Sequence, residues 1–204
     1  MEPAASVHPK ALQILEGAKQ AFMEHGYEGC SVDTIARQAG VSKATVYSHF
    51  GDKRTLFSAV VERECDLQTS RFFTIEVGEP IDAGLRRIAR QFVEFIVSPF
   101  AIQLFRLVVA ETSRFPELGR AFYDSGPDLG HRRLMRVLAA AAASGELRIS
   151  DPELAAHQFV ELCKSDLFFR RLLGVRAKVT EEEIHRVADG AVETFLSAFG
   201  PEKR

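Results

Sequence analysis

Residues suited to covalent or metal cross-links are scarce in this chain. Its 204 residues include only three cysteines, Cys30, Cys65 and Cys163, and no CxxC pair occurs. An odd number of widely separated cysteines gives no disulfide framework, so we expect reduced thiols, as in a cytoplasm. The six histidines have neither the HxxxH nor the HExxH spacing. We therefore expect no metal site.

Signals for export or membrane insertion are also lacking. The first ten residues, MEPAASVHPK, lack the basic and then apolar pattern of a signal peptide. The most apolar run, from Phe100 to Ala110, is interrupted by Gln103 and Arg106. It falls short of the roughly 20 apolar residues that span a bilayer. We expect a cytoplasmic, nucleoid-associated protein without a membrane partner.

Catalytic signatures are missing too. The sequence contains no glycine-rich phosphate loop and suggests no Ser-His-Asp or Cys-His arrangement. Cys163 falls on the apolar side of a predicted helix, which favours packing over a redox role. We expect neither an enzyme nor a bound cofactor.

Net charge gives no general sign of nucleic-acid binding. The formal charge is −2, with 46% hydrophobic and 26% charged residues, and acids balance bases over residues 1–57. This composition allows a sizeable core and argues against wholesale disorder. Between Val41 and Arg54, however, three basic residues and a histidine stand against one acid. Such a local asymmetry is what phosphate contacts require.

The stretch SVDTIARQAGVSKATVYSHFGDKRTLFSAVV has the pattern of two short helices, a tight turn and the start of a longer helix. Ser31 and Ser42 stand where the short helices begin and can accept from the free N–H groups of the first turn. Gly40 follows the first helix, where a left-handed backbone is needed. Val46 and Phe50, four residues apart, point into the core, while small and polar residues point away. This is the layout of a helix-turn-helix, whose second helix enters the major groove.

The run GVSKATVYSHFGDKRTLF places a turn glycine, a cap serine, an aromatic residue and a histidine in one fixed register. In this it closely resembles the DNA-binding segment of the tetracycline-repressor (TetR/AcrR) family of bacterial regulators, over about residues 10–61. The resemblance implies a homodimeric, ligand-responsive regulator, usually a repressor, which binds a roughly palindromic operator in double-stranded DNA.

The resemblance also implies which residues meet DNA. The matching residues are Ser42, Lys43, Ala44, Tyr47, Ser48, His49 and Lys53, with Thr45 as either a phosphate contact or a structural residue. Lys43 lies in the first turn of the groove helix and can reach a base acceptor or a phosphate. Ala44 is small enough for the backbone to approach a thymine methyl group. Lys53 brings its charge near the free N–H groups of its own helix, which suits a phosphate.

The remaining chain has helical periodicity and no alternating pattern long enough for a strand. Beside the helix-turn-helix, the predicted helices cover residues 9–26, 53–73, 80–97, 100–112, 116–123, 128–144, 151–173 and 181–199. The helix at 100–112 is apolar nearly all round, as expected for a helix buried on every side. We expect an all-α fold of about nine or ten helices. A three-helix DNA-binding domain would occupy residues 1–57, and a bundle for effector binding and dimerisation residues 58–204.

The segments VVAETSRFPELGRAFYDSGP and DPELAAHQFVEL, with a basic helix between them, are similar to the AefR-like C-terminal domain of one branch of these regulators. Relatives hold an apolar effector cavity between these helices, and aromatic walls suit one. We expect a small apolar or amphipathic effector, although most of the aromatic residues are core. The candidate contacts are Phe92, Phe95, Gln103, Phe105, Phe122, Tyr123, Phe159, Cys163 and Asp166, of which Gln103 and Asp166 either orient the ligand or face solvent.

The last two predicted helices, at 151–173 and 181–199, carry apolar stripes too wide for one side of a core. Phe195 and Leu196, for example, are adjacent and cannot share one narrow face. We expect the spare surface to pair with a symmetry mate in a four-helix contact. The candidate residues are Phe159, Leu162, Ala188, Val192, Phe195, Leu196 and Phe199.

Two other hypotheses stay open at this point. A small-molecule-binding enzyme or carrier would keep the helix-turn-helix as a scaffold only. Such a protein would have no reason to place four residues along one exposed face, namely Lys43, Tyr47, His49 and Lys53. A regulator without an effector would work constitutively or through a protein partner. The sequence does not separate this last hypothesis from a ligand-responsive regulator.

Overall fold

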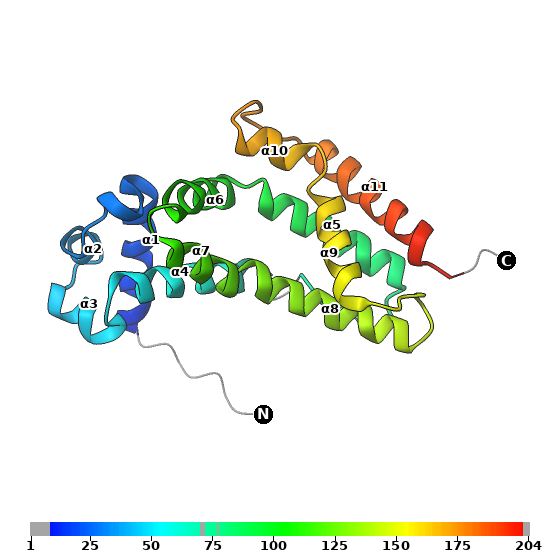
Figure 1. Cartoon of the computed structure of the whole chain (residues 1–204), viewed down its shortest axis with the longest axis horizontal. Helices are drawn as coiled ribbons and strands as arrows, with labels where there is room; N and C mark the ends of the chain where they lie inside the picture. Colours follow the sequence, from blue (N-terminus) through cyan, green and yellow to red (C-terminus); the bar gives the residue numbers. More distant parts are fainter. Residues whose placement is uncertain (1–8, 70–71, 77, 202–204) are drawn as a thin grey trace. The chain divides into compact units, whose positions relative to one another are not determined.

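The computed structural model describes residues 9–69, 72–76 and 78–201 (Figure 1). Over these residues it contains helices and no strand, which confirms the all-α fold class. In chain order the helices are α1 (Pro9–Gly29), α2 (Val32–Gln38), α3 (Lys43–Phe50), α4 (Lys53–Thr69), α5 (Ile81–Ile96), α6 (Pro99–Thr112), α7 (Pro116–Ser125), α8 (Pro127–Ala143), α9 (Pro152–Cys163), α10 (Leu167–Leu172) and α11 (Glu181–Phe199).

The prediction of one continuous helix over residues 151–173 is wrong. The chain breaks between α9 and α10, where Asp166 has a φ of 62°. A left-handed backbone of this kind cannot continue a right-handed helix and is rare outside glycine. The Asp166 carboxylate forms ion pairs with Arg170 and Arg186, which fix the chain at the break. The described chain therefore has eleven helices, one more than the upper end of the prediction.

The prediction that the helix at 100–112 is buried on every side is also wrong. One side of α6 is buried through Ile102, Leu104 and Val108, but Gln103 is exposed and Val109 keeps 62% of its surface accessible.

Taken singly, none of the described helices is long and apolar enough to cross a membrane. The bent pair α5 and α6 together meets that test by length and composition alone.

The chain divides into two compact units. The first combines the chain up to Glu64 with Arg106–Gly126, and the second combines Cys65–Phe105 with Pro127–Arg204. Helices α4 and α6 each contribute residues to both units. The first unit is therefore larger than the predicted DNA-binding domain, and the functional boundary after residue 57 stays a prediction.

The core of the first unit is built on aromatic side chains from α1 and α4. Phe22 and Phe57 are fully buried, with ring centroids 5.3 Å apart in an edge-to-face arrangement, and Tyr27 packs on both rings. α1 also lies very close to α2, because a Cβ atom on Gly17 would stand 2.8 Å from the Cα of Ala39. The absence of a side chain at Gly17 therefore sets how closely the helix-turn-helix sits on α1.

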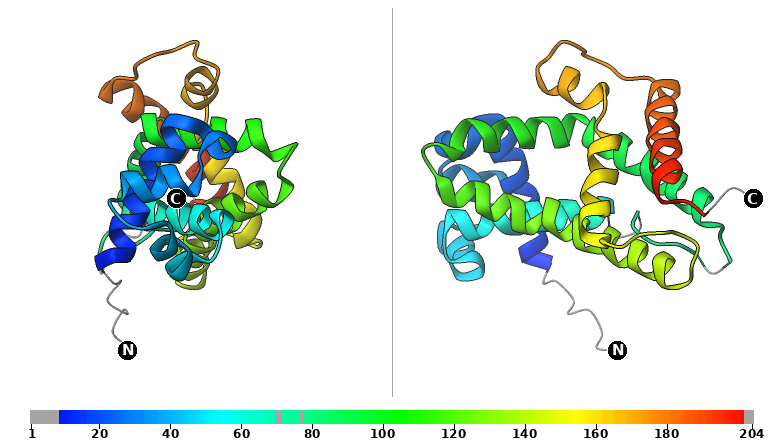
Figure 2. Two further views of the ribbon diagram at one scale, coloured as in Figure 1. Left: turned by 90° about the vertical axis from the view of Figure 1, so that its left-hand side faces the viewer. Right: turned by 45° about the vertical axis from the view of Figure 1, so that its right-hand side comes forward.

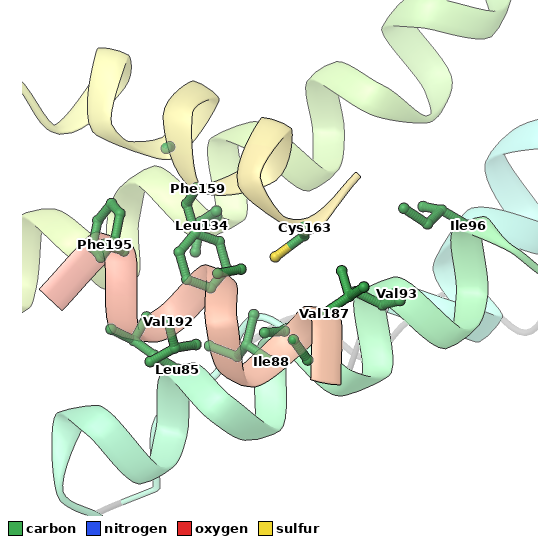
Figure 3. Close-up of a cluster of buried hydrophobic side chains, with 14 of the residues drawn as sticks. Leu85, Ile88, Val93, Ile96, Leu134, Phe159, Cys163, Val187, Val192 and Phe195 are labelled. Atoms are coloured by element: carbon green, nitrogen blue, oxygen red, sulfur yellow. The ribbon is translucent and has the colours of Figure 1, made fainter. Parts of the chain in front are cut away.

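In the second unit α11 packs along α5 and α9, and α8 packs against α9 (Figure 2). Buried side chains from all four helices meet in one core, shown in Figure 3, and include Leu85, Ile88, Leu134, Phe159, Val192 and Phe195. The Phe159 and Phe195 rings meet edge to face with centroids 5.1 Å apart. Burial of each such side chain contributes about 1.5–3 kcal/mol, so this core is the main source of stability for the unit.

Candidate nucleic-acid interface

The turn between α2 and α3 is fixed by side-chain caps and a left-handed glycine. The Ser31 hydroxyl accepts from the Thr34 amide at the start of α2, and the Ser42 hydroxyl accepts from the Thr45 amide at the start of α3. Between them Gly40 has a φ of 61°, a conformation that costs glycine little. These local contacts set the direction in which α3 leaves the turn.

The two sides of α3 differ in exposure as the sequence predicts. Val46 is buried, and Phe50 is half-buried on the same side. On the other side Lys43, Ala44 and Tyr47 are exposed. Ser48 and His49 are exposed as well. The exposed side of α3 thus carries a cation, an aromatic hydroxyl and small polar groups, which together suit a DNA groove.

Three of the predicted contact residues already serve the local fold. The hydroxyl groups of Ser42 and Thr45 lie 2.7 Å apart, so both belong to the cap of α3. The Ser48 hydroxyl donates to the carbonyl of Thr45 at 3.0 Å. Of the two roles considered for Thr45, the structural one is therefore observed directly.

The structure gives Lys53 a role different from the predicted phosphate contact. Its ammonium group donates to the carbonyls of Tyr27 and Cys30 at 2.8 and 3.1 Å, and lies 4.5 Å from the centroid of the Tyr27 ring. An ammonium held by two carbonyls and an aromatic face is directed into the protein. Lys53 therefore fixes the connection between α1 and α2, and its assignment as a DNA contact stays a prediction.

Lys43 has an ionic partner that the sequence motif did not reveal. Its Nζ lies 2.8 Å from Oδ2 of Asp33, which stands in the first turn of α2. This hydrogen bond, with the charge of the carboxylate, raises the pKa of Lys43. The cation at the start of α3 is therefore paired in the protein without DNA.

Arg37 is a basic residue of the same surface that the sequence analysis missed. It is exposed in the last turn of α2, and it forms no ion pair within the described chain. An unpaired guanidinium group beside the groove helix is suited to a phosphate. The sequence offered one indication of this role, because Arg37 follows Asp33 by four residues and so lies one helical turn after it on α2.

Thiol and metal chemistry find no support in the described residues. Cys30 and Cys163 are free and buried. Burial raises the pKa of the Cys30 thiol to about 11 and that of Cys163 to about 12, so both stay protonated and unreactive near neutral pH. No group of three or more histidine, cysteine or acidic side chains in the described chain could hold a metal ion.

The predicted effector residues fall in both compact units. Phe122 and Tyr123 belong to the first unit, whereas the other seven belong to the second. Gln103 is exposed, and Asp166 is occupied by its ion pairs with two arginines. The residues placed within the packed core of the second unit or against it are Phe92, Phe95, Phe105, Phe159 and Cys163.

A cavity on α5 is lined mostly by residues outside the predicted effector set. It has a volume of about 550 Å³, within the usual range for small-molecule sites. Its walls are Phe72, Gln91, Glu94, Phe95, Ser98, Pro99 and Phe100. Oε1 of Gln91 is buried and has no hydrogen-bond partner within the described chain. Of the nine predicted residues, only Phe95 lines this cavity.

The predicted dimerisation residues separate into two groups. Ala188, Val192, Phe195 and Phe159 are buried in the core of the protomer, although Phe195 also lines the groove between α9 and α11. The assignment of these residues to a dimer contact stays a prediction. Burial in the monomer already accounts for the wide apolar stripes. Leu162, Leu196 and Phe199 are partly exposed. A groove of about 520 Å³ between α9 and α11 is lined by Gln158, Glu161, Leu162, Ser165, Thr194, Phe195, Ala198 and Phe199.

A capped helix-turn-helix joined to a separate helical bundle defines the class of helix-turn-helix regulators. Residues 14–60 match the family described as bacterial regulatory proteins, tetR family, and residues 83–201 match the AefR-like transcriptional repressor, C-terminal domain. The second match covers more than half of the chain. The chain therefore belongs to the TetR family of bacterial regulatory proteins, in its AefR-like branch.

Individual relatives agree with this assignment. A putative TetR-family regulator from Mesorhizobium loti is 30% identical, with a TM-score of 0.82 and coverage of 94% of this chain and 96% of that one. Flavonoid-responsive Regulator FrrA is 34% identical, with a TM-score of 0.80 and coverage of 95% and 98%. The repressor AcnR of Corynebacterium glutamicum is 44% identical over 52 residues, which span 26% of this chain and 28% of AcnR.

Proposed function

We propose that the chain is a sequence-specific transcriptional regulator, acting in the cytoplasm as a homodimeric repressor on a roughly palindromic operator. The observation that carries this proposal is the exposed side of α3, with Lys43, Ala44, Tyr47 and His49 outward and Val46 in the core. A protein that used the helix-turn-helix only as a scaffold would gain nothing from this arrangement.

The proposed dimer uses the groove between α9 and α11. The groove is apolar at Leu162 and Phe199, and a four-helix contact with a second copy would cover it. A two-fold dimer presents its two recognition helices to half-sites related by the same symmetry, which is why we expect the operator to be palindromic.

The proposed effector is a small apolar or amphipathic molecule that binds in the α5 cavity. Three phenylalanines supply apolar walls there, and the unpaired oxygen of Gln91 offers a hydrogen-bond acceptor to a ligand that reaches it. The similarity to a regulator described as flavonoid-responsive supports a ligand of this general kind. An effector that releases DNA must bind more weakly to the operator-bound protein, by the same factor. Calorimetric titration with and without operator measures that factor.

The test of DNA recognition begins with selection of bound sequences from genomic fragments. The purified protein is then compared with Lys43→Ala and Tyr47→Ala in mobility shifts on the selected duplex. Each lost base or phosphate contact costs about 1–3 kcal/mol, so both variants should bind at least about fivefold more weakly with unchanged helical circular dichroism. Unchanged affinity in both variants would refute the assigned face.

A further inference from the structure

The ammonium group of Lys43 and the carboxylate of Asp33 form a pair on the surface proposed to meet DNA. Their closest atoms are 2.8 Å apart, and the two side chains keep 49% and 67% of their surfaces accessible. Asp33 belongs to α2 and Lys43 begins α3, so the pair bridges both helices of the motif. If the Lys43 ammonium group contacts DNA while this pair is intact, the Asp33 carboxylate lies within a few ångströms of the same DNA groups.

Few other cations of this region are available to a phosphate. Lys53 is directed into the protein by its two carbonyl partners. Arg54 stands 3.9 Å from the carboxylate of Asp52. Arg37 is the cation of α2 for which the described chain provides no ion pair. The pair with Asp33 thus withholds one of the few available cations from phosphates, although attraction between cations and phosphates supplies most of the affinity for DNA of arbitrary sequence.

We infer that Asp33 is a specificity-determining positioning residue, which acts through Lys43 and rests on the DNA binding proposed above. To bind a phosphate, Lys43 must leave its carboxylate, and Asp33 then faces the phosphates unpaired. To bind an operator, the pair stays intact, because the carboxylate holds the ammonium group in place through one of its three N–H donors. The remaining donors of the ammonium group then match O6 and N7 of guanine. Asp33 therefore weakens binding to arbitrary DNA more than binding to the operator.

The test compares the full-length protein with Asp33→Asn, which keeps the shape of the side chain and removes its charge. Dissociation constants are measured for the selected operator and for a scrambled duplex of equal length, each over a series of salt concentrations. Glu62→Gln is the matched control, because it removes one exposed carboxylate from α4, outside the helix-turn-helix. The double variant Asp33→Asn with Lys43→Gln asks whether Asp33 acts through Lys43.

We expect Asp33→Asn to bind the scrambled duplex about tenfold more tightly, and to lose about tenfold in the ratio of operator to scrambled affinity. The slope of log affinity against log salt concentration on the scrambled duplex should become steeper by about 0.9, the value for one additional phosphate contact, since Lys43 becomes available to a phosphate. Glu62→Gln should leave the ratio unchanged, and in the Lys43→Gln background the effect of Asp33→Asn on the ratio should largely disappear.

Two failures are distinguishable. If the wild-type protein does not prefer any selected duplex over the scrambled one, the proposed function is wrong and the role of Asp33 falls with it. If the wild type discriminates but Asp33→Asn keeps both its ratio and its salt dependence, the proposed function stands and Asp33 has no part in specificity. The inference is also overturned if Asp33→Asn changes the ratio of operator to scrambled affinity as much in the Lys43→Gln background as in the wild-type protein.

Discussion

Replacing Lys53 tests whether its ammonium group stabilises the fold, as its contacts in the structure indicate, or binds a phosphate, as the sequence motif predicts. Lys53→Met removes two hydrogen bonds from a charged donor, at 2.8 and 3.1 Å, and the contact with the Tyr27 ring. Hydrogen bonds to charged groups contribute about 1.5–3 kcal/mol each, and an ammonium over a ring about 0.5–2 kcal/mol. Because Lys53 is only partly buried and methionine keeps its apolar stem, we expect the free energy of unfolding to fall by about 2–4 kcal/mol.

Urea unfolding followed by circular dichroism measures this loss, and hydrogen exchange locates it at the connection between α1 and α2. Arg54→Met is the matched control, since its nearest carboxylate is 3.9 Å away and its side chain is 56% exposed. We expect that control to change stability by less than about 0.5 kcal/mol. The reasoning is refuted if Lys53→Met is as stable as the wild type while it binds the operator more weakly, with a salt dependence reduced by about one phosphate contact.

Three further predictions concern the second unit. Leu162→Glu, which places a charge in the groove between α9 and α11, should give a particle of 22.7 kDa by light scattering, where the wild type gives about twice that mass. Burial, and to a smaller degree the stacked ring of His157, lowers the pKa of His131 below its usual 6.5, so the unfolded state binds protons more readily. The free energy of unfolding, measured in urea titrations, should accordingly be highest above about pH 6.5 and fall as the pH drops below that value. In His131→Phe this fall should be smaller. Thr180→Ala, which removes the capping box with Glu183, should lower the free energy of unfolding by about 1 kcal/mol in urea titrations, and an unchanged value would refute the cap.

Local features of the fold could be predicted from the sequence. The caps at Ser31 and Ser42 and the left-handed turn at Gly40 depend on residues within four positions of each other, so spacing alone reveals them. The inward side of α3, marked by Val46, follows from helical periodicity and is confirmed. For the same reason the all-α class was predictable from the chain alone.

Contacts between distant residues were not predictable in this way. The partners of Lys53 lie 23 and 26 residues away, and no pattern in the sequence points from one to the other. Periodicity also gave no warning of the break at Asp166, because a left-handed aspartate there depends on its pairs with Arg170 and Arg186. Most of the predicted effector residues were chosen for their aromatic character, which packed cores and ligand cavities share.

The composition of the first unit has a consequence for the order of folding during synthesis. Residues 106–126 complete this unit: the Phe115 ring packs on Tyr27, Arg114 forms an ion pair with Glu28, and Leu118 is fully buried. Domains generally fold from the N-terminus as the ribosome releases them. Here the helices that carry the DNA-reading face emerge first, yet their apolar surface waits for a segment made some forty residues after Glu64. A chain that ends before residue 106 should therefore leave α1 more open to limited proteolysis than a chain that includes residues 106–126.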